Sequence, residues 1–265
     1  MEPTFEQAAF SYDQSFTFSP IGRLQRQAVW DYLKQNFQHA SRLNVLELTC
    51  GTGEDALFWT KLGHTVIATD QSPAMLSVVQ HKIIQSGENT NIETRVLDLN
   101  EFPGTLLGDQ FDLIFSNFGG LNCIDYLTFQ RIVDFFPSLI KPQGRVILVV
   151  MPRFCLWEQF YFLVKLNPKR AFVRLKRDAV KVQLEAKAVY TWYYSPREIY
   201  KLFSKKFQLV HKKPIGFFIP PSYLNPFFQK RPKLLSFLNK LEKRVSSFSL
   251  LASFSDHFLI DYRLK

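Results

Sequence analysis

Val45-Leu46-Glu47-Leu48-Thr49-Cys50-Gly51-Thr52-Gly53-Glu54-Asp55 is the stretch that decides the fold of this chain. An apolar run containing one carboxylate, Glu47, passes into a tight turn with two glycines, and a helical pattern follows over 56–59. A strand, a glycine loop and a helix in this order bring the backbone close to a nucleotide-like ligand. The stretch therefore predicts the first unit of a parallel α/β sheet.

Two classes of ligand fit this loop. Gly51-x-Gly53-x-x-Ala56 satisfies the dinucleotide fingerprint, in which alanine is allowed at the third position. Glu47 favours the other class, because a carboxylate at the end of the strand gains nothing from a pyrophosphate but attracts a ligand with an ammonium group. An NAD-dependent oxidoreductase is therefore the least favoured enzyme class.

The loop resembles the first motif of the class I S-adenosylmethionine-dependent methyltransferases, acidic-x-x-x-Gly-x-Gly. In that family the acidic residue, here Glu47, lies by the methionine end of the cofactor, and the glycine turn lets the backbone approach the nucleoside. Thr49 stands where members usually have glycine, which is tolerable if its backbone angle is ordinary. The resemblance is closest to the small-molecule enzymes that include those of quinone biosynthesis, and it implies S-adenosylmethionine as cofactor.

Residues 64–70 form a predicted second strand that ends in a carboxylate. Asp70 can accept hydrogen bonds from both ribose hydroxyls of a nucleoside, although an ordinary turn aspartate also fits this position. Ser72-Pro73 then supplies an N-cap and a proline at the first helical position, so a helix begins there. The order of strand, carboxylate and helix repeats the first unit.

Two further strands are predicted over 91–97 and 111–116. Asp98 follows the first of them, and the resemblance implies that it meets the adenine amino group, with a neighbouring backbone amide on the ring; a plain turn residue is the alternative. Asn117 follows the second, in a loop that contains Gly119 and Gly120. Ligands of open parallel sheets bind off the carboxyl ends of the strands, where this loop must lie.

The N-terminal segment is expected to fold over the cofactor, as it does in related methyltransferases. The resemblance places Tyr12 near the sulfonium and Arg23 near the carboxylate, with core packing and a solvated helix face as the alternatives. No metal site is predicted. The full set of predicted cofactor contacts comprises Tyr12, Arg23, Glu47, Thr49, Cys50, Gly51, Thr52, Gly53, Asp70, Gln71, Met75, Asp98, Leu99, Ser116, Asn117 and Phe118.

Methyl transfer from a sulfonium is an in-line displacement in which the cofactor carries the difficult chemistry. The protein must align the acceptor and, for a hydroxyl acceptor, help to remove a proton. Asn117 and His257 are the two weak catalytic candidates, and a mechanism by positioning alone, without a general base, fits equally well.

The whole chain is predicted to be one α/β domain with a Rossmann-like, doubly wound, mostly parallel seven-stranded sheet whose last strand is antiparallel. Residues 1–40 are the segment covering the cofactor, and residues 41–151 form the cofactor-binding core. Two insertions, after the fifth and sixth strands at 152–194 and 214–252, are expected to form a basic, aromatic lid. Three scattered cysteines, no apolar run long enough to span a membrane and no signal-peptide pattern favour a cytoplasmic protein.

Charge is divided unevenly along the chain. Residues 1–150 contain 10 Lys and Arg against 16 Asp and Glu, which is a net charge of −6. Because the whole chain has a net charge of +10, residues 151–265 have a net charge of +16. The basic half fits three roles: a lid over an apolar acceptor pocket, a surface that docks peripherally on an anionic membrane, or, less favoured, a nucleic-acid groove. We expect methyl transfer to a hydrophobic or amphipathic, lipid-like small molecule; the alternatives are an RNA methyltransferase and a non-catalytic, membrane-associated cofactor-binding protein.

Overall fold

The computed structural model describes residues 9, 12–87, 91–103, 106, 108, 110–184 and 187–265. Strands and helices alternate along the first half of the chain. The strands are β1 (Asn44–Leu48), β2 (Thr65–Asp70), β3 (Ile92–Val96), β4 (Phe111–Ser116), β5 (Ile140–Val150), β6 (Val180–Leu184), β7 (Lys187–Thr191), β8 (Phe207–Ile215) and β9 (His257–Leu264). The α-helices are α2 (Pro20–Phe37), α3 (Glu54–Lys61), α4 (Pro73–Ser86), α5 (Tyr126–Leu139), α6 (Leu156–Val164), α7 (Pro168–Ala171), α8 (Pro196–Phe203), α9 (Asn225–Phe228) and α10 (Pro232–Val245).

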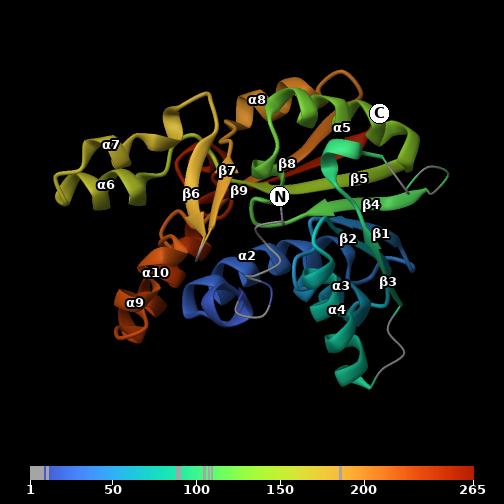
Figure 1. Cartoon of the computed structure of the whole chain (residues 1–265), viewed down its shortest axis with the longest axis horizontal. Coiled ribbons are helices and arrows are strands. Elements are labelled where there is room, and N and C mark those ends of the chain that lie inside the picture. The colour runs from blue at the N-terminus through green and yellow to red at the C-terminus, as the bar shows by residue number, and fades with distance from the viewer. Residues whose placement is uncertain are drawn as a thin grey trace.

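Seven strands form the central sheet, in the order β3-β2-β1-β4-β5-β9-β8 (Figure 1). β1 to β5 pair in parallel, whereas β9 runs antiparallel to both of its neighbours, β5 and β8. The predicted mostly parallel seven-stranded sheet with an antiparallel last strand is confirmed. β1 and β4 lie side by side although β2 and β3 separate them in sequence, so the strand order reverses beside β1, where ligands of such sheets bind.

Both faces of the sheet are covered by helices. α5 and α8 pack on one face, and α2, α3 and α4 pack on the other (Figure 1). The central strands are apolar on both sides for this reason, and successive residues contribute alternately to the two cores. In β5, for example, Ile147 and Val149 belong to the core under α2 and α3, whereas Val146 and Leu148 belong to the core under α5.

Three helices begin at the serine-proline pairs that the sequence indicates. The hydroxyls of Ser19, Ser72 and Ser195 each accept a hydrogen bond from a backbone N–H in the first turn of α2, α4 and α8, respectively. At α8 the Glu198 side chain also accepts from the Ser195 backbone, which completes a capping box. These local signals are strong because the caps satisfy backbone donors that have no partner inside the helix.

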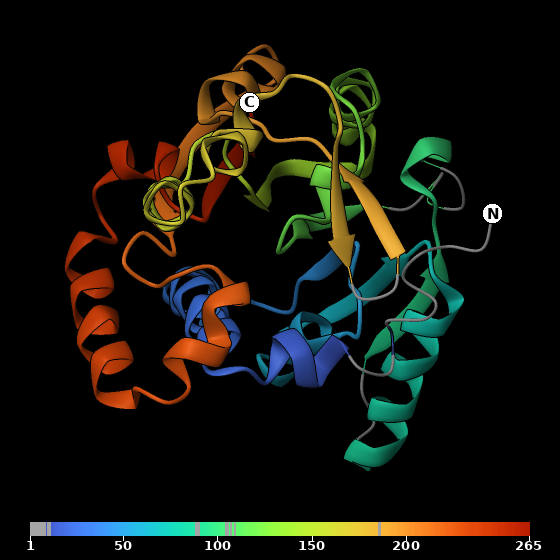
Figure 2. The ribbon, with the colours of Figure 1, turned by 60° about the vertical axis from the view of Figure 1, so that its left-hand side comes forward.

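The elements after β5 build the second half of the molecule around the antiparallel strands. β6 and β7 pair as a separate hairpin, and α6–α7 and α9–α10 extend on the same side of the molecule (Figures 1 and 2). A buried carboxylate, Glu242 of α10, accepts four backbone hydrogen bonds from residues 216–219 at 2.7–3.2 Å and ties α10 to the end of β8. Among the residues that the structure describes, no helix has the length and apolarity needed to cross a membrane.

Candidate functional site

A cavity of about 270 Å³ opens at the carboxyl ends of β1, β2, β4 and β5. Most of the predicted cofactor residues meet there, although they are far apart in the sequence. Those that line the cavity are Tyr12, Thr49, Cys50, Gly51, Thr52, Asp70, Gln71, Met75, Asp98, Leu99, Asn117 and Phe118. Among the described residues, the cavity wall also contains Glu54 and Asp55 against one cationic side chain, Arg26, so its acidic lining suits a ligand that carries a sulfonium and an ammonium group.

The glycine turn after β1 has a left-handed backbone at Thr49 as well as at its glycines, and only the threonine is strained by it. Thr49 has a φ of +56°, so the condition under which threonine would be tolerated here, an ordinary backbone angle, is not met. Its hydroxyl donates to the Leu48 carbonyl at 2.6 Å and lies 3.0 Å from the Ser116 hydroxyl, and these contacts hold the residue in the left-handed region. A Cβ on Gly120 would approach the Thr49 side chain to 2.0 Å, so the glycine of the neighbouring loop makes room for the threonine.

Gly51 is the point at which a ligand can come closest to the backbone. It has a φ of +53°, and a Cβ built on it would meet no other atom within 4 Å. Its N–H donates to the Asp70 carboxylate at 2.9 Å, and the N–H of Ser72 donates to the other Asp70 oxygen at 3.0 Å. Because each carboxylate oxygen accepts more than one hydrogen bond, Asp70 can hold the turn and still meet ribose hydroxyls.

Asp98 lies at the opposite wall, after β3. Its Oδ1 accepts hydrogen bonds from the backbone N–H of Asn100 at 2.8 Å and from the Asn100 side chain at 2.9 Å. These bonds fix a short turn in which Leu99 is buried and lines the cavity. A carboxylate beside backbone amides matches the amino group and ring nitrogen of an adenine edge. The adenine contact itself stays a prediction.

The cation that faces the cavity is Arg26 rather than Arg23. Three residues advance a helix by nearly one turn, but Arg23 faces solvent beside the Phe18 ring, whereas Arg26 is buried and reaches the cavity wall. The prediction for Arg23 is therefore wrong, because the register of α2 on the sheet could not be read from the segment alone. Tyr12 does line the cavity, and removal from water raises its pKa to about 12, so the phenol stays protonated at neutral pH.

Asp55, in the cavity wall, accepts hydrogen bonds from three side chains. Its carboxylate forms a buried ion pair with Arg26 and accepts hydrogen bonds from Trp30 Nε1 at 2.6 Å and Asn117 Nδ2 at 3.1 Å. Burial alone would lower the pKa of Arg26, but the Asp55 carboxylate raises it above its ordinary value, so the guanidinium stays charged. The network joins α2, α3 and the loop after β4, and it orients Asn117 toward Asp55.

Glu47 is buried within β1 and does not reach the cavity surface. It is 1% exposed, and its Oε2 has no hydrogen-bond partner. Burial, together with the nearby Asp55 carboxylate, raises the pKa of Glu47 well above its ordinary range. A contact of this carboxylate with the ammonium group therefore stays a prediction.

Two more predicted contacts lie beneath the cavity wall rather than in it. Gly53 packs against Val79 of α4, which a Cβ would approach to 2.8 Å, so this glycine serves the packing of helix against helix. Ser116 is buried at the end of β4, where its hydroxyl contacts Thr49. Residues 50–52 of the turn line the cavity, whereas Gly53 and Ser116 face the protein interior.

Part of the cavity wall is apolar, and most of this part comes from the second half of the chain. The β6–β7 hairpin contributes Val182, Val189 and Thr191 to the wall, next to Met151 at the end of β5 and Ile124. None of the described residues of the second predicted insertion, 214–252, lines this cavity. Of the two predicted insertions, only 152–194 contributes described residues to the wall.

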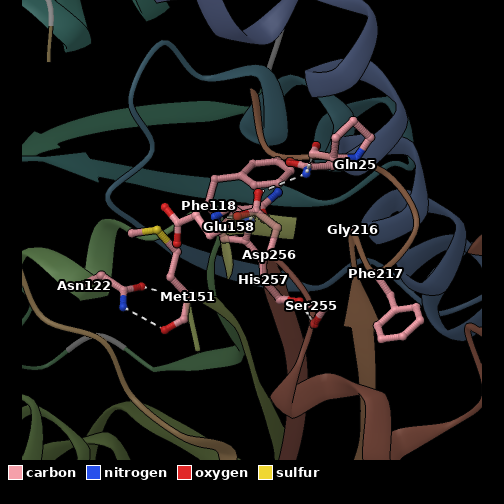
Figure 3. Close-up of polar contacts among 12 residues, drawn as sticks. Gln25, Phe118, Asn122, Met151, Glu158, Gly216, Phe217, Ser255, Asp256 and His257 are labelled. Atoms are coloured by element: carbon pink, nitrogen blue, oxygen red, sulfur yellow. Dashed lines mark hydrogen bonds and ion pairs between the residues drawn. The ribbon is translucent and has the colours of Figure 1, made fainter. Parts of the chain in front are cut away.

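Asn122 connects these apolar walls. Its Oδ1 accepts from the Met151 backbone N–H at 2.9 Å, and its Nδ2 donates to the Met151 carbonyl at 3.2 Å (Figure 3). The same Nδ2 donates to the Trp192 carbonyl at 2.6 Å. One buried amide therefore positions the end of β5 and the chain that leaves β7. The sequence contained a hint of this role, since Asn122 lies in the loop after β4, but its partners are separated from it by 29 and 70 residues.

His257 lies behind the cavity. Its ring meets the face of Phe118 edge-on at a centroid distance of 5.5 Å, and its Nδ1 lies 3.3 Å from an oxygen of Asp256 (Figure 3). His257 is buried and does not line the cavity, so the structure gives it no direct contact with a bound acceptor. The prediction of a catalytic role for His257 is not supported by its position, since Phe118 stands between the imidazole and the cavity.

A family model for the methyltransferase domain matches residues 45–144 of the chain. The match spans most of the parallel part of the sheet, from β1 into β5. A protein of Bacillus subtilis (strain 168), YqeM, named only as a candidate methyltransferase, is 29% identical over 119 residues, which are 44% of this chain and 45% of that protein. The matched stretch thus spans less than half of this curated relative.

Solved structures resemble the chain over nearly its whole length. A complex of DhpI described as containing SAM has a TM-score of 0.62 at 18% identity and covers 98% of this chain and 94% of its own. An S-adenosylmethionine-dependent methyltransferase from Mesorhizobium loti has a TM-score of 0.56 at 15% identity, and the match covers 89% of this chain and 97% of that protein. The predicted class I methyltransferase fold is confirmed, and the comparisons support the predicted enzyme class and cofactor; the likeness to quinone-biosynthesis enzymes stays a prediction.

Proposed function

We propose that this protein transfers the methyl group of S-adenosylmethionine to a hydrophobic or amphipathic small molecule. The observation that carries the proposal is that two chemically different sets of residues line one cavity. The glycine turn, Asp70 and Asp98 provide polar groups, and Met151 and the β6–β7 hairpin provide apolar walls. We assign the first set to a nucleoside cofactor and the second, the acceptor end of the cavity, to an apolar acceptor.

The acidic half of the cavity favours the positively charged methyl donor. In the transfer step the acceptor atom attacks the methyl carbon, the bond between carbon and sulfur breaks, and the sulfur keeps the electron pair, which leaves neutral S-adenosylhomocysteine. The protein contributes by aligning the acceptor in line with this bond and by excluding water. The described cavity wall has no histidine, and burial raises the pKa of the Cys123 thiol to about 12. Catalysis by positioning suits this wall better than general-base catalysis by Cys123.

Strand alternation in β7 offers a matched test of the acceptor end. Val189 lines the cavity, whereas Tyr190, the next residue, is 58% exposed on the other side of the hairpin. A carboxylate at 189 would be desolvated by an apolar acceptor, so Val189→Asp should raise the KM for the acceptor at least tenfold and leave the affinity for S-adenosylhomocysteine within about twofold. Tyr190→Asp should change neither quantity.

The acceptor can be sought directly with S-adenosylmethionine labelled in its methyl group. Purified protein is incubated with this donor and either an organic-solvent extract of cells or total RNA, and radioactivity is counted in each product fraction. The proposal predicts label in the organic fraction, reduced in Val189→Asp and retained in Tyr190→Asp. Label in RNA alone, or binding of S-adenosylhomocysteine without transfer to either pool, would contradict it in favour of RNA methylation or of a non-catalytic protein.

A further inference from the structure

α6 exposes a row of apolar residues, although its two polar side chains are buried. Glu158 and Gln159 are buried on its inner side, whereas the opposite face is open to solvent. The residues of that open face recur at helical spacing, and Phe160 and Val164 are 67% and 68% exposed; the face consists of Leu156, Phe160, Leu163 and Val164. A helix that faces only water has the reverse arrangement, so this face calls for an apolar neighbour.

A buried ion cluster fixes the orientation of α6. Glu158 forms an ion pair with Arg174, and Arg174 also donates to the carboxylate of Asp256 at 2.8 Å and to its backbone carbonyl at 3.0 Å. All three charged side chains are buried. Rotating the helix to hide its apolar face would break this cluster and leave charges unpaired in the interior, so the exposed face is a stable feature of the fold.

The exposed apolar surface continues beyond α6. Leu166 is 91% exposed in the turn before α7, and Leu250 is 80% exposed after α10. Both helical pairs lie on the same side of the molecule in the two views (Figures 1 and 2). We call this set the docking surface; its apolar members are Leu156, Phe160, Leu163, Val164, Leu166, Phe172, Leu175, Tyr223, Phe227, Leu234, Phe237, Phe248 and Leu250.

The charged residues of the docking surface all have the same sign. The only acidic residues within 152–177 and 225–250 are Glu158 and Glu242, and both are buried. Glu242 is engaged by four backbone N–H groups, so neither carboxylate faces solvent. Apart from the buried Arg174 and the half-buried Arg153, the cations of the same segments are exposed: Lys165, Lys169, Arg170, Lys176, Arg177, Lys230, Arg231, Lys233, Lys240, Lys243 and Arg244.

We propose that this docking surface binds the face of an anionic lipid bilayer. Exposed aliphatic and aromatic residues enter the boundary between headgroups and acyl chains, and Lys and Arg remain at the level of the acidic headgroups. RNA would explain the cations and aromatic rings but not exposed aliphatic residues such as Leu156, Leu166 and Leu250, which have no partner on a polynucleotide. The docking does not depend on methyl transfer, and it would bring the protein to the phase in which an amphipathic acceptor is dissolved.

The test is flotation of the full-length protein with vesicles of neutral phosphatidylcholine, or of phosphatidylcholine with about one-third phosphatidylglycerol. The apolar variant is Phe160→Asp with Val164→Asp, and its matched control is Ile84→Asp, because Ile84 is 75% exposed on α4 away from the docking surface. The cationic variant is Lys240→Glu with Lys243→Glu. All of these side chains are exposed, so the fold should persist, and unchanged binding of S-adenosylhomocysteine verifies it.

We expect wild type and Ile84→Asp to float with the anionic vesicles, and not with the neutral ones, and to be released by salt. The partition coefficient of the apolar variant onto the anionic vesicles should be at least tenfold lower than that of wild type. The removal of each cation should lower this coefficient about fivefold. Failure of the wild type to float, or flotation of the apolar variant equal to that of wild type, would overturn the proposal. Protein that fails to float but binds RNA, or that self-associates through this surface in sedimentation, would also overturn it.

Discussion

The backbone N–H of Gly51 donates to the carboxylate of Asp70 at 2.9 Å, and this bond joins the glycine turn after β1 to the end of β2. The N–H of Ser72 orients the second oxygen of the same carboxylate at 3.0 Å. The turn and the carboxylate are therefore preorganised together, at a point where a Cβ on Gly51 would meet only open space. This relationship defines where a nucleoside can enter.

Asp70→Asn should weaken binding of S-adenosylhomocysteine about 10- to 100-fold. The amide removes the negative charge and replaces one acceptor oxygen by a donor, so it cannot serve Gly51, Ser72 and two ribose hydroxyls together. Calorimetric titration measures the change. Asp125→Asn is the control, because Asp125 caps α5 by accepting from the Thr128 N–H at 2.7 Å and does not line the cavity; equal affinities of the two variants would remove Asp70 from the site.

Glu47 should make the unliganded protein less stable as the pH rises. Its pKa is raised by burial, so the folded protein keeps a proton that the unfolded chain loses above the ordinary value of 4.5. The contribution of Glu47 to the free energy of unfolding therefore falls as pH rises from 4.5 to the folded-state pKa, by about 1.4 kcal/mol per pH unit at most. Urea unfolding of wild type and Glu47→Gln at pH 5 and pH 8 tests this.

The variant Glu47→Gln cannot ionise, so its stability relative to wild type should increase between pH 5 and pH 8. Parallel curves for the two proteins would show that Glu47 titrates near its ordinary pKa when folded. Glu101→Gln, at an exposed position of the turn after β3, controls for the loss of one carboxylate.

The organisation of the fold could be predicted from sequence because its signals are local. The apolar runs of β1 to β5 and the serine-proline caps each depend on a few adjacent residues. The carboxyl ends of parallel strands share one edge of the sheet, so Asp70, Asp98 and Asn117 could be placed near the cavity without knowing any distance.

The remaining features depend on contacts between distant segments. The choice between Arg23 and Arg26 depends on how α2 is rotated against the sheet. The hydrogen bond from the Asn122 side chain to the Trp192 carbonyl joins residues that are 70 positions apart. The strain at Thr49 could not be predicted either, because the space for it is provided by Gly120 of another loop. The orientation of α6 depends on a buried pair, Glu158 and Arg174, whose members are 16 positions apart.

Asn117→Ala should lower turnover more than cofactor affinity. The Asn117 side chain donates to Asp55 at 3.1 Å, and its oxygen accepts from the N–H of Phe118, whose φ is +47°. Loss of the amide frees this strained loop at the cavity wall, so the acceptor should be aligned less well. Steady-state kinetics with the identified acceptor, beside calorimetry with S-adenosylhomocysteine, measure both effects. Unchanged turnover would show that the loop needs no such support.

Glu242→Gln should destabilise the protein by about 2–4 kcal/mol. The carboxylate accepts four backbone N–H groups, and an amide can replace only part of these bonds while it turns a donor toward the remaining N–H groups. Urea unfolding measures the loss, and Glu101→Gln, at an exposed position, should be nearly neutral. Because Glu242 is remote from the cavity lining, the affinity for S-adenosylhomocysteine at low urea should remain that of wild type.

The most direct measurement of the proposed cofactor is a pair of calorimetric titrations of the purified protein, one with S-adenosylhomocysteine and one with NAD. We expect one molecule of S-adenosylhomocysteine to bind per chain, with the affinity reduced in Asp70→Asn, and no binding of NAD. Binding of NAD without binding of S-adenosylhomocysteine would contradict the assignment of the cavity to a methyl donor.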